Sequence, residues 1–189
     1  MIETEVLVEV KESFKKAKTS LQEFNYYGLK KTIDTYYYDP LRSDLKPYSN
    51  GKLYSSFRVR QKGDDIFVTY KNDHYIEDIW QYSDEYEIKV DDLTSIKLIL
   101  DNLGFKKLLV IDSEKHFYQF NEYEIVLENV KDLGVFLEVE LKKEISSEQV
   151  HVYKEKILHF IKNLDICTSN ELNSGKPELY LQKNNITID

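Results

Sequence analysis

Alternation of polar and apolar residues with a period of two is the pattern that most constrains the fold of this chain. In residues 2–10, three glutamates share one face and four apolar residues mostly share the other (Glu3, Glu5 and Glu9; Ile2, Val6, Val8 and Val10). Successive side chains of a β-strand point to opposite faces, so the pattern indicates a strand with one polar face and one apolar face.

The rest of the chain predicts more strands than helices. Seven further segments have strand composition: 32–38, 53–62, 66–71, 84–90, 106–120, 122–128 and 135–143. Apolar residues at helical spacing predict helices at 12–25, 93–103 and 147–163, and a polar tail is expected to close the chain. Without regular alternation of strand and helix, we expect a mainly-β α+β fold. It would be one domain over residues 1–189, with an antiparallel sheet or barrel and peripheral helices.

Composition narrows the partners and the compartment. The net charge of −8 argues against a sequence-independent nucleic-acid binder, which needs surplus Lys and Arg. The one cysteine, Cys167, allows no intrachain disulfide, and no apolar run reaches the ~20 residues of a membrane-spanning helix. The N-terminus lacks the profile of a signal peptide. We therefore expect a cytoplasmic protein that binds neither nucleic acid nor membranes, with a homodimer as an open alternative for its assembly.

Carboxylates recur in pairs two residues apart. Three such pairs lie on three predicted strands: Glu3 and Glu5, Glu85 and Glu87, and Glu138 and Glu140. Because residues two apart share a strand face, the pairs could converge inside a barrel. Carboxylate oxygens suit Mg²⁺ or Mn²⁺, which bind through a few carboxylates, waters and substrate phosphates.

Basic residues show the same spacing. Arg58 and Arg60 share one face of a predicted strand, and the hairpin partner strand carries Lys71. Arginine offers a bidentate fork to phosphate oxygens, and lysine acts as a compact charge. Acids on one wall and bases opposite would hold a metal and a polyphosphate together.

A plainer interpretation applies to each pair alone. Alternating charge usually marks the solvated face of a half-buried sheet. The chain has 34 acidic residues, so several Glu-x-Glu pairs arise by chance. The order of the motifs along the chain, more than any single pair, favours the functional interpretation.

In that order, the sequence resembles the CYTH family, the triphosphate tunnel metalloenzymes. The matching segments are Glu3-Thr4-Glu5, Asp34-Thr35-Tyr36-Tyr37-Tyr38-Asp39, Phe57-Arg58-Val59-Arg60, Val68-Thr69-Tyr70-Lys71, Asp84-Glu85-Tyr86-Glu87, Leu127-Glu128-Asn129-Val130 and the stretch from Leu133 to Glu140. The resemblance implies a closed tunnel of eight antiparallel strands that encloses the substrate and a divalent metal. It implies metal ligands among Glu3, Glu5, Glu87, Glu128, Glu138 and Glu140, and catalytic roles for Arg58, Arg60, Lys71, Lys115 and Glu85.

Two positions depart from the family pattern. Leu7 stands where the first strand should carry a lysine, and Ser113 stands where a later strand should carry another, with Lys115 at the following arginine position. An alternative frame would place Asp112 and Glu114 at these last two positions. Three other lysines, Lys52, Lys89 and Lys176, could supply the missing charge, although the sequence does not place them.

The resemblance implies a triphosphate-containing substrate such as ATP, inorganic triphosphate or thiamine triphosphate. Hydrolysis would release a terminal phosphate, and cyclisation of ATP, as in class IV adenylyl cyclases, would release pyrophosphate. Both reactions use the same electrostatic clamp. A non-catalytic binder of phosphorylated metabolites or polyphosphate is the alternative that Leu7 and Ser113 favour.

Overall fold

A computed structural model describes residues 2–48, 51–77 and 79–188, and at Ile2 and Glu3 it describes the backbone alone. The strands are β1 (Ile2–Glu3), β2 (Glu5–Val10), β3 (Asn25–Tyr38), β4 (Ser55–Lys62), β5 (Asp65–Ile76), β6 (Ile79–Val90), β7 (Lys106–Phe120), β8 (Tyr123–Val130), β9 (Gly134–Leu141) and β10 (Thr168–Glu171). The helices are α1 (Phe14–Ser20), α2 (Leu93–Asn102), α3 (Val150–Lys162) and α4 (Lys176–Lys183), with short 3₁₀ turns at Ser43–Leu45 and Ser147–Gln149. The mainly-β α+β class is therefore confirmed.

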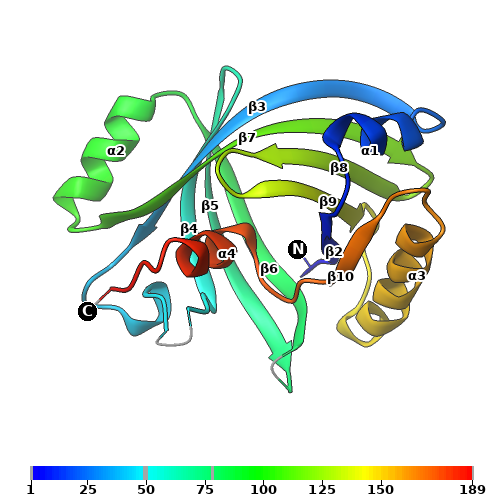
Figure 1. Ribbon diagram of the computed structural model, residues 1–189. Coiled ribbons are helices and arrows are strands. Elements are labelled where there is room, and N and C mark those ends of the chain that lie inside the picture. Colours follow the sequence, from blue (N-terminus) through cyan, green and yellow to red (C-terminus); the bar gives the residue numbers. More distant parts are fainter. Residues whose placement is uncertain (1, 49–50, 78, 189) are drawn as a thin grey trace.

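All ten strands of the described chain form one curled antiparallel sheet, in the order β1-β6-β5-β4-β3-β7-β8-β9-β2-β10 (Figure 1). The hydrogen-bonded order is that of an open sheet, and this corrects the expectation of a closed barrel of eight strands. The N-terminal segment changes partners at Thr4, because β1 pairs with β6 whereas β2 pairs with β9. Thr4 itself accepts the Leu141 amide at 3.0 Å, so the two ends of the curl share one short stretch of chain.

The hairpin of β4 and β5 follows the sequence prediction closely. Lys62 lies opposite Asp65, which leaves Gly63 and Asp64 as a two-residue turn. Gly63 has a φ of +64°, a value that a tight hairpin turn requires and that glycine adopts without strain. This turn fixes the register that brings the residues of β4 beside those of β5.

The apolar core lies on the convex side of the sheet. On β2, β8 and β9 the outward side chains pack under α1 and α3, and the fully buried ones include Val6, Ile125 and Leu137, which meet Ile157 of α3. A second cluster, with Val59 and Leu100, lies between β4 and α2. Period-two alternation then turns the other side chains of these strands inward. Helices α1, α2 and α3 therefore cover the outer faces, and the polar residues line the concave side.

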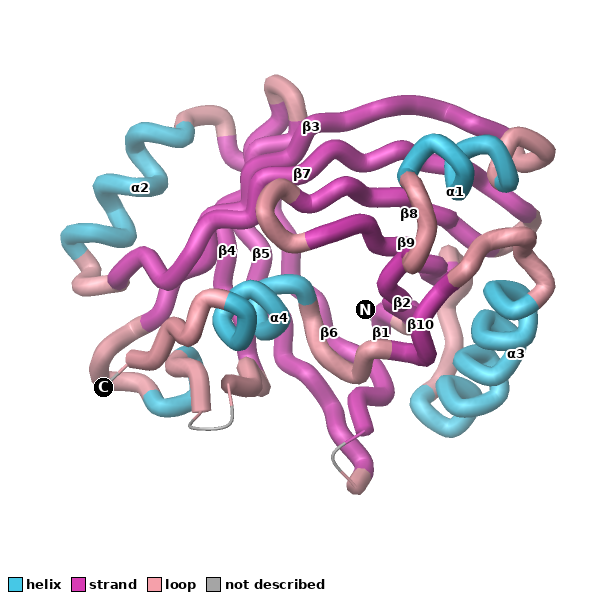
Figure 2. Tube along the Cα trace, viewed as in Figure 1, coloured by secondary structure: helices cyan, strands magenta, loops and turns pink. Residues whose placement is uncertain are grey.

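The C-terminal segment differs from the polar tail that the sequence suggested. It forms β10 and α4, and α4 lies across the open side of the curled sheet (Figures 1 and 2). Leu181 is almost fully buried and packs with Ile111 and Phe136. One buried leucine on a short helix is too weak a periodic signal to distinguish from a tail.

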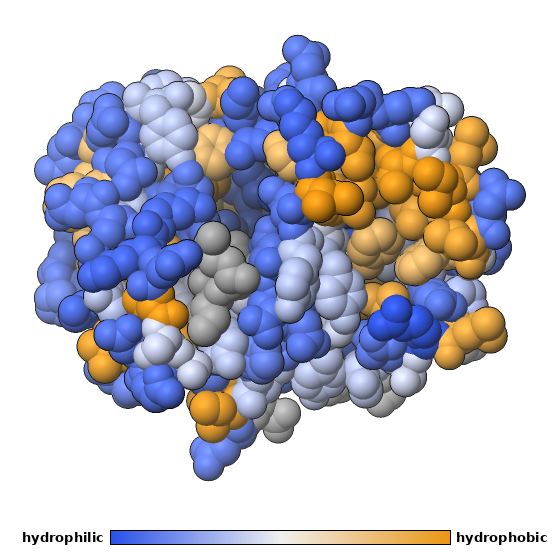
Figure 3. All heavy atoms as spheres, turned by 180° about the vertical axis from the view of Figure 1, so that it is seen from behind, coloured by the Kyte–Doolittle hydropathy of each residue, from blue (hydrophilic) through white to orange (hydrophobic). Residues whose placement is uncertain are grey.

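Leu98 and Ile99 of α2 and Leu103, which caps that helix, are exposed apolar residues. Figure 3 shows an apolar area at the right of the rear face of the molecule. Across the part of the chain that the structure describes, no helix is both long and apolar enough to cross a membrane.

Candidate active site

One cavity of about 260 Å³ occupies the concave side of the sheet. Ten of the eleven residues predicted as catalytic or metal-binding line it: Arg58, Arg60, Lys71, Glu85, Lys115, Glu5, Glu87, Glu128, Glu138 and Glu140. The eleventh prediction, Glu3, falls outside the side chains that the structure describes. The structure thus brings the predicted set together, while the roles assigned to these residues stay predictions.

The basic wall is centred on Arg60 of β4. Its guanidinium donates two hydrogen bonds to the Asp34 carboxylate on β3, at 2.7 and 2.6 Å. Burial alone would raise the pKa of Asp34, but the charges of Arg60, Arg58 and Lys115 outweigh it and hold that pKa well below its ordinary value. Asp34 is therefore ionised, and it fixes Arg60 in one orientation toward the cavity.

Arg58 has a different environment from Arg60. Its side chain is buried, Nη1 lies 3.5 Å from the Tyr36 hydroxyl, and Nε has no hydrogen-bond partner among the described residues. A buried guanidinium with unused donors is costly unless an anion joins it. Arg58 is therefore the cation in this wall that is best prepared to receive a phosphate.

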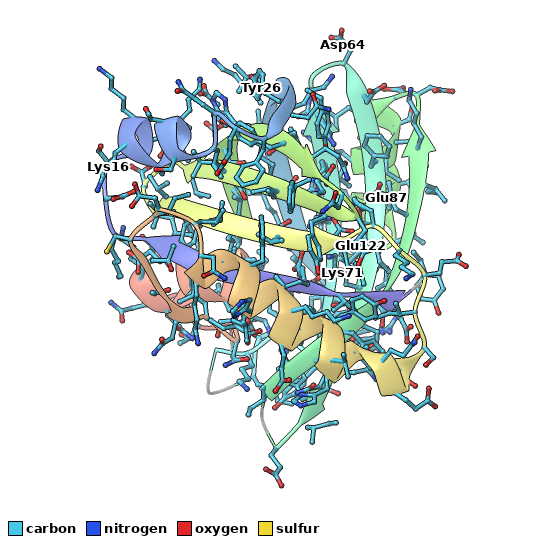
Figure 4. The ribbon with its side chains drawn as sticks, turned by 90° about the vertical axis from the view of Figure 1, so that its right-hand side faces the viewer. Lys16, Tyr26, Asp64, Lys71, Glu87 and Glu122 are labelled. Carbon is cyan, nitrogen blue, oxygen red and sulfur yellow. The ribbon has the colours of Figure 1, made fainter. Side chains whose placement is uncertain are left out.

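On the neighbouring strands, Lys71 of β5 pairs with Glu85 of β6 at 2.8 Å. The hydroxyl of Thr69 donates to Glu87 at 2.8 Å. Lys71 and Glu87 are labelled among the strands in Figure 4, whereas Asp64 projects from the β4–β5 turn. The side chains of Glu85 and Glu87 thus both face the cavity, as the period-two spacing predicted.

The acidic wall holds two lysines. Lys176, the first residue of α4, donates 2.6 Å to Glu128 and also contacts Glu138, and Lys115 lies 3.6 Å from Glu128. Burial alone would raise the pKa of both carboxyl groups, but Lys115 and Lys176 outweigh it and lower them. Burial alone would lower the pKa of Lys176, but Glu128 and Glu138 outweigh burial and raise that pKa above its ordinary value. Glu128, Glu138 and Lys176 are therefore charged near neutral pH. For Lys115 burial outweighs the nearby Glu128 and lowers its pKa.

The remaining predicted acids, Glu5 and Glu140, line another part of the same cavity. Glu5 of β2 and Glu140 of β9 are directly opposite each other in the sheet. Lys142 contacts Glu140 at 2.6 Å and Glu124 at 3.4 Å. This end therefore also contains a lysine beside its carboxylates.

The fit of a divalent metal depends on how these carboxylates are grouped. Their oxygen donors suit Mg²⁺ or Mn²⁺. In the described part of the chain, however, no three His, Cys, Asp or Glu side chains are close enough together to hold an ion. Lys176 stands between Glu128 and Glu138 instead. In this arrangement the predicted ligands do not form a coordination sphere.

The structure also locates the departures from the family pattern. Leu7 lines the cavity and lies opposite Glu138, while Ser113 is buried and shares a 2.7 Å hydrogen bond with Thr32. Of the three lysines considered as replacements, Lys176 lines the cavity.

The other two replacement candidates lie elsewhere. Lys89 pairs with Asp65 on the exterior, and Lys52 lies over the Tyr75 ring. Lys176 therefore supplies the added cation, and it arrives from a helix that the sequence analysis did not predict.

The comparison with protein families bears on this site. Residues 1–174 match the family model described as the CYTH domain. The chain belongs to the CYTH domain family. The match ends two residues before Lys176, so α4 lies beyond the CYTH segment.

Individual CYTH relatives extend along nearly the whole chain. A Methanocaldococcus jannaschii protein named "Putative adenylate cyclase" is 27% identical over 180 residues, which cover 95% of this chain and 98% of that protein. The solved PH1819 protein of Pyrococcus horikoshii superposes with a TM-score of 0.78 at 23% identity, covering 95% and 99% of the two chains. The HpAC1 structure from Hippeastrum has a TM-score of 0.64 at 13% identity, covering 98% and 97%. These structural likenesses establish the CYTH fold.

Asp34 was given no role from the sequence, and Lys176 was only one of three lysines that could replace a missing charge. Asp34 lies within a quoted motif, but only its contact with Arg60 reveals that it orients the basic wall. Lys176 directly precedes Pro177 in the C-terminal segment, and a proline in the first turn of a helix was the available signal.

Glu178, next to this site, provides a pH prediction. Its carboxylate accepts the amides of Leu53 at 2.8 Å and Gly175 at 2.7 Å. Burial raises the pKa of Glu178 from 4.5 to about 7, although those amides lower it. The folded state then binds a proton more tightly than the unfolded chain. Its stabilising contribution, up to about 3 kcal/mol, is complete below pH 4.5 and is lost as pH rises through 7.

The test is urea denaturation of the wild type and Glu178→Gln at a series of pH values across the range from 4.5 to about 7. We expect the free energy of unfolding of the wild type to fall with pH more steeply than that of Glu178→Gln. Equal slopes for the two proteins would refute the raised pKa.

Proposed function

We propose that this protein is a divalent-metal-dependent enzyme that hydrolyses a triphosphate in the cavity of its curled sheet. One observation carries the proposal: a buried row of cations faces a wall of glutamates inside one cavity, and the Nε of Arg58 in that row has no partner among the described residues. A linear chain of phosphates has the charge and length that such a row would neutralise. Membership of the CYTH family supports the same substrate class.

In this proposal the side chains of the basic wall perform the binding. Arg58 and Arg60 contact the phosphate oxygens, with Arg60 held in place by Asp34, and Lys71 and Lys115 add charge from the flanking strands. Positioned cations stabilise the charge that shifts onto the leaving oxygens in the transition state. Glu85, held beside Lys71, accepts a hydrogen bond from the attacking water. A bound Mg²⁺ or Mn²⁺ would supply further neutralisation of the phosphates.

Hydrolysis is preferred over cyclisation of ATP for a specific reason. The Hippeastrum structure is described as an adenylyl cyclase-named protein with a dominant triphosphatase activity, and that description concerns that protein. The M. jannaschii relative is named for cyclisation instead. The same cation row serves both reactions, so formation of cyclic AMP is the second candidate.

A phosphate-release assay tests the proposal directly. The purified chain is incubated with inorganic triphosphate, ATP or thiamine triphosphate and with Mg²⁺, Mn²⁺ or chelator, from neutral to strongly alkaline pH. We expect metal-stimulated phosphate release from at least one substrate, and cyclic AMP is measured in parallel. Absence of both products under every condition would leave the non-catalytic binder as the function of this fold.

A further inference from the structure

Lys176 occupies a buried position between two carboxylates of the cavity. Its Nζ lies 2.6 Å from Glu128 and also contacts Glu138. The side chains of Lys176 and Glu138 are 14% and 15% exposed, and that of Glu128 is 1% exposed. Buried charges of this kind persist only when they are paired, so each of these groups depends on the others.

The cluster is electrically balanced without a metal. Lys115 and Lys176 contribute two positive charges, and Glu128 and Glu138 contribute two negative charges. A divalent ion added to these carboxylates would leave two uncompensated positive charges in a buried site. An ion would therefore bind only weakly while Lys176 remains in place.

The position of Lys176 depends on α4 rather than on the sheet. Pro177 and Glu178 follow it in the first turn, and Glu178 attaches that turn to the loop at Leu53. Leu181 packs the helix into an apolar cluster with Ile111 and Phe136. The ammonium group is thus carried by one separate element, whereas both carboxylates belong to β8 and β9.

We propose that Lys176 is a tethered cation that competes with a divalent metal for Glu128 and Glu138. The metal binds these carboxylates when the residue 173–178 segment releases the ammonium, so α4 sets the metal affinity of the site. This inference rests on the proposed function only for the identity of the competing ion. It gives the C-terminal segment, beyond the residues that match the family, control over the site.

The experiment measures Mn²⁺ binding by electron paramagnetic resonance, with no substrate present. The proteins are the wild type, Lys176→Met, Lys176→Arg and Lys183→Met. Lys183 is in the same helix, and its ammonium contacts the carbonyl of Asp132 outside the cavity, which makes it the matched control. We expect Lys176→Met to bind Mn²⁺ at least about tenfold more tightly than the wild type, because a competing charge is removed at contact distance. Lys176→Arg and Lys183→Met should resemble the wild type.

Binding of Mn²⁺ by Lys176→Met with the affinity of Lys183→Met would overturn the proposal. Amide hydrogen exchange of the wild type provides an independent test, in case Lys176→Met does not fold. Saturating Mn²⁺ should increase exchange in residues 173–183, and Glu138→Gln should abolish that increase. Mn²⁺ binding without any change in those amides would also overturn it.

Phosphate release, measured on the same proteins, separates the two proposals. Tighter Mn²⁺ binding by Lys176→Met without turnover of any triphosphate would leave the tethered cation standing and remove the proposed function. Turnover by the wild type, together with unchanged Mn²⁺ affinity in Lys176→Met, would support the proposed function and remove the tethered cation.

Discussion

Replacing Arg58 by methionine is expected to lower kcat/KM for a triphosphate by about 10²- to 10³-fold, with little change in the free energy of unfolding. Burial and the nearby Arg60 would lower the pKa of Arg58, but Tyr36, Asp34 and Glu85 outweigh them, so the guanidinium stays charged. It is buried, with one long hydrogen bond to Tyr36, and its Nε has no partner in the part of the chain that the structure describes. Removing it therefore relieves a desolvation cost while it removes a phosphate-binding group. Steady-state kinetics and urea denaturation measure the two quantities.

Arg60→Met is the matched control for this prediction, because it removes the same charge from the same strand face. Arg60 is the double hydrogen-bond partner of Asp34, whose side chain is 6% exposed. Its removal leaves a buried carboxylate unpaired and is expected to cost about 3–5 kcal/mol of stability. Equal destabilisation by the two substitutions would contradict the difference between Arg58, which is buried with a donor that no described residue uses, and Arg60, which Asp34 holds in place.

The inward-facing residues of the sheet were predictable from local spacing. A period of two assigns Arg58 with Arg60, and Glu85 with Glu87, to single faces whatever the rest of the fold does. The two-residue turn at Gly63 then fixes the register between β4 and β5. Strand periodicity and the turn at Gly63 were therefore enough to predict which side chains of these strands share a face.

The pairing of the acidic wall with Lys176 could not be predicted in the same way. Lys176 is 48 residues from Glu128 and 38 from Glu138, and it reaches them from a short helix with one buried leucine. Only the folding of α4 across the open side of the sheet brings these charges together. The open order of the sheet was missed for a related reason. The change of strand partner at Thr4 depends on β6 and β9, which are remote in sequence.

Replacing Glu138 by alanine is expected to abolish metal-stimulated phosphate release, a loss of at least about 10³-fold, while the protein stays folded. Glu138 is one of the two carboxylates for which Lys176 and a metal would compete, and its loss leaves Lys115 and Lys176 both beside Glu128. Glu128→Ala should instead destabilise the fold, because it removes the partner of Lys115. Circular dichroism and the phosphate assay on both variants distinguish these effects. A Glu138→Ala protein as active as the wild type would show that the metal does not use this carboxylate, and would move the proposed ion toward Glu5 and Glu140.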